Sequence, residues 1–120
     1  MYSRSKYGNR KSGGYDSKKE RHRAFELKML ERQGIISDLK EQVKFELIPA
    51  QYETYLVPLK TKMAERKRCV EHACSYIADF TYYDEEGAYV VEDAKGFKTE
   101  IYRLKKKLML QKYGIKIKEA

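Results

Sequence analysis

The sequence predicts an α/β domain in which a helix, three strands, a second helix and a last strand form a mixed central sheet. Residues 42–48 and 115–118 alternate polar and apolar side chains, as strands with one buried face do. Residues 76–83 and 88–94 are rich in aromatic and β-branched side chains and flank a turn at 84–87, which predicts a β-hairpin. A helix between the hairpin and the last strand makes a crossover connection, so we expect a partly parallel sheet.

The first helix is predicted to begin after Ser17 and to end before Gly34. Ser17 is a good N-cap and Glu20 stands at the third helical position, the spacing of a capping box. Apolar residues follow at helical spacing, and Gly34 stands where a left-handed glycine often closes a helix. The preceding residues, 1–16, have no apolar periodicity, so we expect a disordered basic tail followed by one domain over 17–120.

The middle of the chain is predicted to contain one strand and a projection. In the strand at 42–48, Val43, Phe45 and Leu47 share a face, and Pro49 ends the strand. The segment 50–68 is interpreted as a projecting loop or an extended hairpin, because Pro58 excludes a central strand there. Its second half carries a basic cluster with one acid, Glu65; the cations are Lys60, Lys62, Arg66, Lys67 and Arg68. The cluster could be a solvated face or an arm that contacts DNA.

The second helix is predicted to run from 100 to about 112, with Thr99 as its N-cap and Gly114 at its end. One stripe of this helix is expected to face the core, and it contains Ile101, Leu104, Leu108 and, at its margin, Gln111. The outward face is expected to be basic, with Arg103, Lys106 and Lys107.

The hairpin carries three residues whose chemistry suits a divalent cation. Asp79 lies on its first strand, while Asp93 and Lys95 are two residues apart on its second strand and must point the same way. Folding about the turn brings Asp79 beside Glu92 and Asp93. Carboxylates supply oxygen ligands, and a lysine near bound water and phosphate can position a nucleophile or stabilise developing charge. Asp79 lies in a run that otherwise reads as buried, so it needs a metal or a cation such as Lys95 as its partner.

Other polar residues compete for this site or could join it. Glu92 is the alternative to Asp93, but strand alternation puts it on the opposite face from the motif lysine, which favours Asp93. Glu20 is either only a helix cap or also a metal ligand, if the helix start abuts the hairpin. Glu46 is a weaker candidate because it lies on the polar face of its strand, and Gln42 at that strand's entrance could touch DNA or the site.

An acid on one strand followed by Asp-x-Lys on the next resembles the PD-(D/E)xK nuclease superfamily. From 17 to 119 the chain also resembles a phage family of small proteins within that superfamily, described as a domain of unknown function and sometimes labelled Holliday junction resolvase. The matching runs are 17–20, 26–27, 42–49, 76–80, 91–96 and 98–108. The resemblance implies a restriction-endonuclease-like core.

The resemblance also implies Mg²⁺-dependent hydrolysis of DNA, with Mn²⁺ as a substitute ion. Asp79, Asp93 and the backbone carbonyl of Ala94 would bind the ion. Lys95 would orient the attacking water or neutralise the phosphate, and Glu20 would add a ligand or serve a second ion. The implied substrate is branched or junction DNA, and symmetric cutting of a junction would call for a homodimer. The alternative from another class is a nucleic-acid-binding accessory protein that keeps the fold without turnover.

The amount and distribution of positive charge indicate that the protein binds a polyanion. The net charge is +8, and residues 1–23 contain eight Lys or Arg against two acids, so about three quarters of that charge lies at one end. The expected DNA contacts lie on the helix after the motif and in the second basic cluster: Lys98, Tyr102, Arg103, Lys105, Lys106, Arg66, Lys67 and Arg68.

Other classes are excluded by residue counts. Cys69 and Cys74 flank His72, and His22 is the other histidine, so a four-ligand zinc site is not expected. With no signal peptide, we expect reduced thiols and a phage-encoded protein that acts in the cytoplasm of the bacterial host. No apolar run approaches the roughly 20 residues needed to span a membrane, so no membrane contact is expected.

Overall fold

The computed structural model describes residues 17–94 and 98–120, and it confirms an α/β fold with a mixed sheet. The elements, in chain order, are α1 (Lys18–Arg32), β1 (Ser37–Ile48), β2 (Gln51–Pro58), β3 (Met63–Glu71), β4 (Cys74–Tyr83), β5 (Tyr89–Asp93), α2 (Glu100–Tyr113) and β6 (Lys118–Glu119). The predicted basic tail and Lys95 lie outside the described residues.

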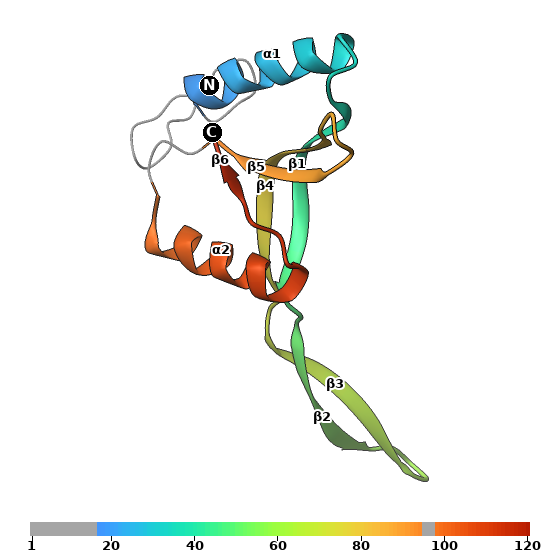
Figure 1. The fold of residues 1–120 in the computed structure, drawn as a ribbon. Coiled ribbons are helices and arrows are strands. Elements are labelled where there is room, and N and C mark those ends of the chain that lie inside the picture. The colour runs from blue at the N-terminus through green and yellow to red at the C-terminus, as the bar shows by residue number, and fades with distance from the viewer. Residues whose placement is uncertain (1–16, 95–97) are drawn as a thin grey trace, which may run out of the picture.

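The central sheet has the strand order β1-β4-β5-β6. β4 is antiparallel to both β1 and β5, whereas β6 returns after α2 to pair parallel with β5, as the predicted crossover requires. β2 and β3 form a separate two-stranded ribbon, so segment 50–68 contributes to an extended hairpin, one of its two predicted forms. Figure 1 shows this ribbon projecting away from the sheet and both helices, and the molecule measures 67 × 41 × 26 Å.

Local capping signals set the helix ends. The Ser17 side chain accepts a hydrogen bond from the backbone N–H of Glu20 (3.1 Å), and Thr99 Oγ1 accepts one from the N–H of Tyr102 (3.0 Å). Gly34 follows α1 with φ 77°, and Gly114 caps α2 with φ 66°, so both predicted glycines occupy the left-handed region. None of the described helices is long and apolar enough to cross a membrane.

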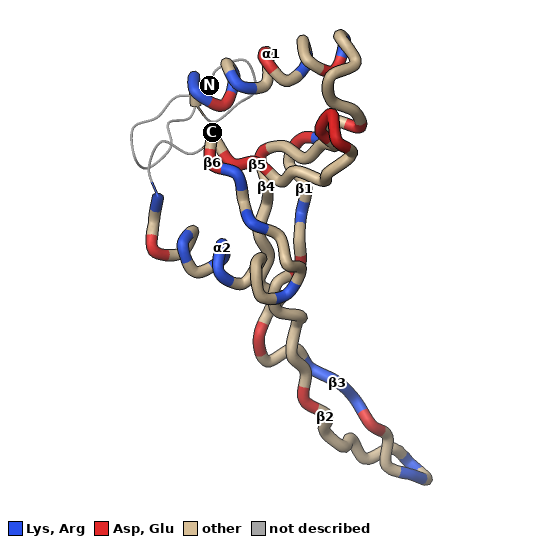
Figure 2. Tube along the Cα trace, viewed as in Figure 1, with Lys and Arg blue, Asp and Glu red and all other residues tan. Residues whose placement is uncertain are grey.

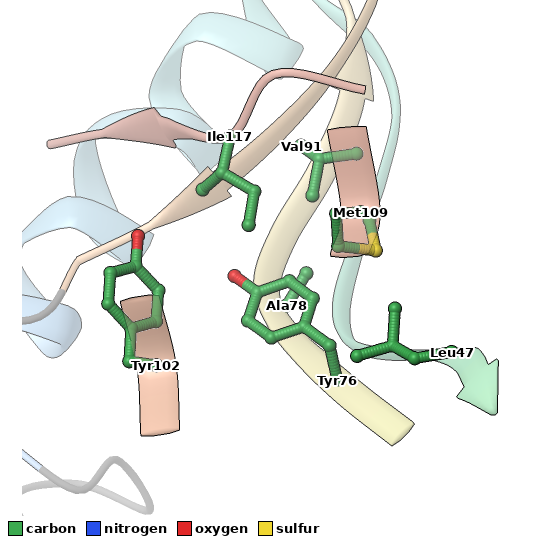
Figure 3. Packing of buried hydrophobic residues seen from close by; sticks show 7 residues of the cluster. All are labelled: Leu47, Tyr76, Ala78, Val91, Tyr102, Met109 and Ile117. Atoms are coloured by element: carbon green, nitrogen blue, oxygen red, sulfur yellow. The ribbon is translucent and has the colours of Figure 1, made fainter. Parts of the chain in front are cut away.

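Two clusters of buried side chains form the core, one beside each helix. The α2 cluster, drawn in Figure 3, gathers seven residues: Leu47, Tyr76, Ala78, Val91, Tyr102, Met109 and Ile117. The α1 cluster gathers Ala24, Leu27, Ile36, Phe80, Tyr82 and Ala94. β4 supplies both clusters, with a change from one to the other between Ala78 and Phe80. The residue between them is Asp79, so this aspartate lies where the two clusters meet.

The predicted inward face of α2 is wrong at Ile101 and Leu104 and confirmed at Leu108, which is half-buried against the α2 cluster. Ile101 is 67% exposed and Leu104 58% exposed, while Tyr102 and Met109 are buried. Neighbouring residues on a helix are about 100° apart, so seating the large Tyr102 ring in the core turns Ile101 outward. Tyr102 can be buried because its hydroxyl donates to Glu119 Oε2 at 3.0 Å.

Two strands differ from prediction in length. β1 begins at Ser37, earlier than the predicted start at 42, and two of its non-glycine residues, Asp38 (φ 53°) and Gln42 (φ 55°), have left-handed backbones. β6 is confined to two residues, although Ile117 just before it is buried as the predicted alternation requires. The alternation of Val43, Phe45 and Leu47 toward the core is confirmed.

Candidate functional site

Asp79 and Asp93 lie at the same level on the two inner strands of the sheet. Phe80 pairs with Glu92 in the antiparallel ladder, so the next step along both strands sets Asp79 level with Asp93. Asp79 Oδ2 accepts a hydrogen bond from the backbone N–H of Ala94 at 2.9 Å. The side chain of Asp79 thus reaches the point where β5 ends, and of the two acids expected beside it, Glu92 and Asp93, the strand register puts Asp93 at its level.

Asp93 is buried and is oriented by a buried phenol. Tyr76 donates its hydroxyl to Asp93 Oδ2 at 2.6 Å. Burial, and then this hydrogen bond, raise the pKa of Tyr76 far above its usual range, so the phenol remains a proton donor to the carboxylate. A short charge-assisted bond of this kind fixes the direction of the carboxylate.

Glu92 is fully buried and engaged in an ion pair with α1. Arg23 donates Nε to Oε2 at 2.6 Å and Nη2 to Oε1 at 2.9 Å, and the Tyr82 hydroxyl donates to Oε1 at 2.8 Å. The hydrogen bond to Glu92 raises the pKa of Arg23 above its ordinary value, and burial raises the pKa of Tyr82 to about 12. Glu92 therefore ties α1 to β5, while Asp93 next to it faces Tyr76 on the other side. This arrangement favours Asp93 over Glu92 as the site carboxylate.

Glu20 reaches the same level of the sheet through Gln42. Its side chain is buried, and Oε1 accepts from Gln42 Nε2 at 2.9 Å. Gln42 stands opposite Asp79, because the pairs on either side of it are Glu41 with Phe80 and Val43 with Ala78. The start of α1 thus abuts the hairpin, which is the condition under which Glu20 can act at the site as well as in the helix cap.

Gln42 has a backbone that its residue type does not favour. Its φ of 55° lies in the left-handed region, which a non-glycine residue adopts at a cost of about 1–3 kcal/mol. Strain of this size persists only where the surroundings enforce it, and it is concentrated at functional positions. Strand alternation runs through this position unbroken in the sequence, so no local signal reveals the left-handed residue.

The oxygen donors present fit a hard cation of the magnesium type. Mg²⁺ is commonly held by one or two carboxylates while it keeps several waters, which matches Asp79 and Asp93. The buried Ala94 follows directly, and Lys95, the third element of the motif, lies outside the described residues. Within residues 17–94 and 98–120, no group of three or more His, Cys, Asp or Glu side chains is placed to hold a metal ion. An ion held by these two carboxylates would depend on water and substrate for its remaining ligands.

Glu46 is not brought to this site. It pairs with Ser75, four residues along β1 from Gln42, which corresponds to about 13 Å of strand. Its backbone carbonyl accepts hydrogen bonds from Lys112 Nζ (2.9 Å) and the Tyr113 hydroxyl (2.6 Å) at the far end of α2.

The expected DNA contacts fall into two separate groups, which Figure 2 shows along α2 and along β3. On the α2 side, Lys98 and Lys106 lie 3.5 Å and 3.1 Å from Glu119 Oε1, and the hydrogen bond from Lys106 is the main cause that lowers the pKa of Glu119. Arg103 is exposed and Lys105 partly exposed. Tyr102 is buried in the core, so the expectation that its side chain contacts the DNA backbone does not fit the structure.

The second group lies on the ribbon. Arg66, Lys67 and Arg68 are exposed on β3, and the ribbon carries them away from the carboxylates, as Figure 1 shows. Because the two groups lie far apart on the protein, each would contact a different part of a nucleic acid.

The fold and the site define a small α/β protein with a mixed sheet and a carboxylate pair across its two inner strands. The model of the family described as "Protein of unknown function (DUF1064)" matches residues 4–119, and the chain belongs to this family. No curated protein and no solved structure matches the chain significantly.

Proposed function

We propose that the protein is a metal-dependent endonuclease that hydrolyses phosphodiester bonds of DNA, with branched or junction DNA as its substrate. The observation that carries the proposal is the strand register, which sets Asp79 and Asp93 at one level of the inner strands, with Glu20 joined to that level by Gln42. This arrangement supports membership of the PD-(D/E)xK superfamily and a restriction-endonuclease-like core. A role in phage replication or recombination is proposed from the sequence resemblance.

In this proposal each site residue has one task. Asp79 and Asp93 hold the ion, and a bound Mg²⁺ would polarise the phosphate and make a coordinated water acidic enough to attack it. The Ala94 N–H and the Tyr76 hydroxyl hold the two carboxylates in direction, as outer partners of metal ligands do. Lys95 orients the water or meets the charge that develops on the phosphate.

Two copies of the chain are needed for symmetric cutting of a four-way junction. The described residues of one chain contain one such site, and two symmetric incisions require two sites related by a two-fold axis. The homodimer is therefore part of the proposal.

The second candidate is a nucleic-acid-binding accessory protein without turnover. It is favoured by the observation that the described residues place only a pair of acids together and not a larger metal-binding group. Both candidates need the basic surfaces, and only the nuclease needs the carboxylates.

A cleavage assay separates the two. Labelled four-way junction, duplex and single-stranded DNA are incubated with the protein in Mg²⁺, in Mn²⁺ and in chelator. We expect metal-dependent cutting of the junction, its loss in Asp79→Asn and Asp93→Asn, and unchanged cutting in Glu85→Gln, a matched exposed carboxylate in the turn of the same hairpin. Binding without any cutting in either metal would favour the accessory protein.

Cutting within a few fold of the unmodified protein in either aspartate variant would exclude the site. Glu92→Gln tests whether Asp93, and not its neighbour Glu92, is the site carboxylate. Glu92 is engaged with Arg23, so its loss should affect stability and not cutting. This variant should unfold more readily while it keeps metal-dependent cutting at low temperature.

A further inference from the structure

The β2–β3 ribbon contributes to neither core cluster. No residue from 51 to 71 belongs to, or is packed against, the two clusters in the described structure. A two-stranded ribbon by itself is at best marginally stable in water, so it gains little from folding alone. From Gln42 to Pro58 the chain follows about 50 Å of strand, which places the tip of the ribbon far from the carboxylates. The ribbon is therefore positioned to contact a part of a binding partner that the carboxylate site does not touch.

The tip of the ribbon combines apolar side chains with lysines. A tight turn, closed by a hydrogen bond from the Leu59 N–H to the Lys62 carbonyl (2.7 Å), projects Lys60 and Lys62. Leu59 is 44% exposed and Met63 55% exposed on either side of them. Exposed apolar side chains lower their free energy when they leave water for an apolar environment. Lysines beside them can bind phosphates.

The shaft behind the tip is balanced in charge, with three cations (Arg66, Lys67, Arg68) and three acids (Glu53, Glu65, Glu71). Tyr55 pairs directly with Arg66, and the Arg68 guanidinium lies 4.4 Å over the Tyr55 ring and 2.7 Å from Glu53 Oε1. The excess of positive charge lies at the tip, where residues 59–63 contain Lys60 and Lys62 and no acid. This charge complements a polyanion and opposes the approach of a second ribbon of the same sign, so the structure favours DNA over a second copy as the occupant. The major groove of DNA is wide enough to admit a two-stranded ribbon.

We propose that the ribbon is a DNA-binding arm whose tip, Leu59 and Met63, inserts as an apolar wedge between bases at a branch point. Leucine and methionine are among the side chains that partly unstack base steps in this way, while flanking cations contact the phosphates. Separating bases costs least where the stack is already interrupted, so the wedge favours branched over continuous DNA. The inference rests on the proposed nuclease function, for which it names the feature of DNA that is recognised.

Base stacking at the branch point can be measured without cleavage. The fluorescent base 2-aminopurine is placed beside the branch of a four-way junction and at the same sequence position in a continuous duplex, and the protein is titrated in chelator. We expect fluorescence to rise on the junction, because the base leaves its stack, and to change little on the duplex. The double variant Leu59→Ser with Met63→Ser should lose the rise and bind the junction about tenfold more weakly, with duplex affinity within about twofold.

Two further variants control this result. Leu110→Ser removes an equally exposed leucine (54%) from α2, and it should leave the fluorescence unchanged. Lys60→Gln with Lys62→Gln should weaken binding to both DNAs and lower the slope of log affinity against log salt by up to about 1.8, roughly 0.9 for each phosphate contact. Because Leu59 and Met63 are exposed, the melting temperature of their double variant should match that of the unmodified protein, which shows that the loss is not one of folding.

The outcomes separate the wedge from the nuclease. An undiminished fluorescence rise in the Leu59 and Met63 double variant overturns the wedge. A change of that variant from dimer to monomer in sedimentation, with the rise retained, shows instead that the tip seats on a second copy. A rise that is lost in the double variant but kept in Asp79→Asn supports the wedge, and it does so even if the unmodified protein cuts no DNA.

Discussion

Arg23→Ala removes the cation from the buried ion pair that joins α1 to β5. Glu92 is fully buried and would keep the Tyr82 hydroxyl and, at 4.0 Å, the exposed Lys118 ammonium as its neighbours. Breaking a buried pair from one side typically costs about 3–5 kcal/mol, because a charge is left without its partner. The Arg23 side chain is itself 21% exposed, which allows water to reach the cavity, so we expect the lower end of that range, about 3 kcal/mol.

Urea unfolding and a thermal melt measure this loss. For a domain of this size about 3 kcal/mol corresponds to a fall in Tm of at least about 12 °C. Arg32→Ala, which changes an exposed arginine at the end of the same helix, should cost no more than about 0.5 kcal/mol. Adding Glu92→Gln to Arg23→Ala should recover part of the stability, since a neutral amide replaces the unpaired carboxylate.

A loss below about 1 kcal/mol at neutral pH would refute the assignment of Arg23 and Glu92 as a buried structural pair.

Three further predictions concern the site and its surroundings. Lys95→Ala should keep Mg²⁺ affinity in calorimetry but lower single-turnover cleavage by about 10²–10³, because a protonated lysine is no metal ligand; lost metal affinity would contradict this role. Gln42→Gly should be more stable than Gln42→Ala by about 1 kcal/mol in urea unfolding, since glycine suits φ 55°, whereas an ordinary strand position would favour alanine. Stability should fall as the pH rises from about 10 through about 12, because burial raises the pKa of Tyr82 to about 12 and its protonated form stabilises the fold below the unfolded pKa of about 10. A Tyr82→Phe variant should lose part of that alkaline dependence.

The elements that follow from local chemistry could be read from the sequence. Ser17, Thr99 and Gly114 act on backbone groups within a few residues of themselves, so the helix ends were predictable. The inward face of α2 was not, because Ile101 and Tyr102 compete for the core and the outcome depends on the distant Glu119, which accepts the tyrosine hydroxyl.

The candidate site likewise has one part that could be predicted from the sequence and one part that could not. The turn expected at 84–87 brings Asp79 near Glu92 and Asp93, but the choice between them depends on one residue: five residues, 84–88, separate the paired Tyr83 and Tyr89, and this sets Asp79 level with Asp93. The ion pair of Arg23 with Glu92 spans 69 positions, and the contact of Glu20 with Gln42 spans 22. Both depend on how α1 lies against the sheet, which no short pattern of residues encodes.

The separation of the ribbon from both core clusters divides the chain into parts with different evolutionary freedom. Substitutions in the clusters or around Asp93 and Glu92 disturb packing, buried charge and chemistry together, so few of them are tolerated. Substitutions along 51–71 leave the core untouched, and even changes in ribbon length are restricted mainly by the need to keep β2 and β3 paired. The ribbon can therefore change in sequence and length while the core and the two carboxylates stay the same; under the proposed function, such changes would alter the DNA structure that is selected and leave the chemistry of cutting unchanged.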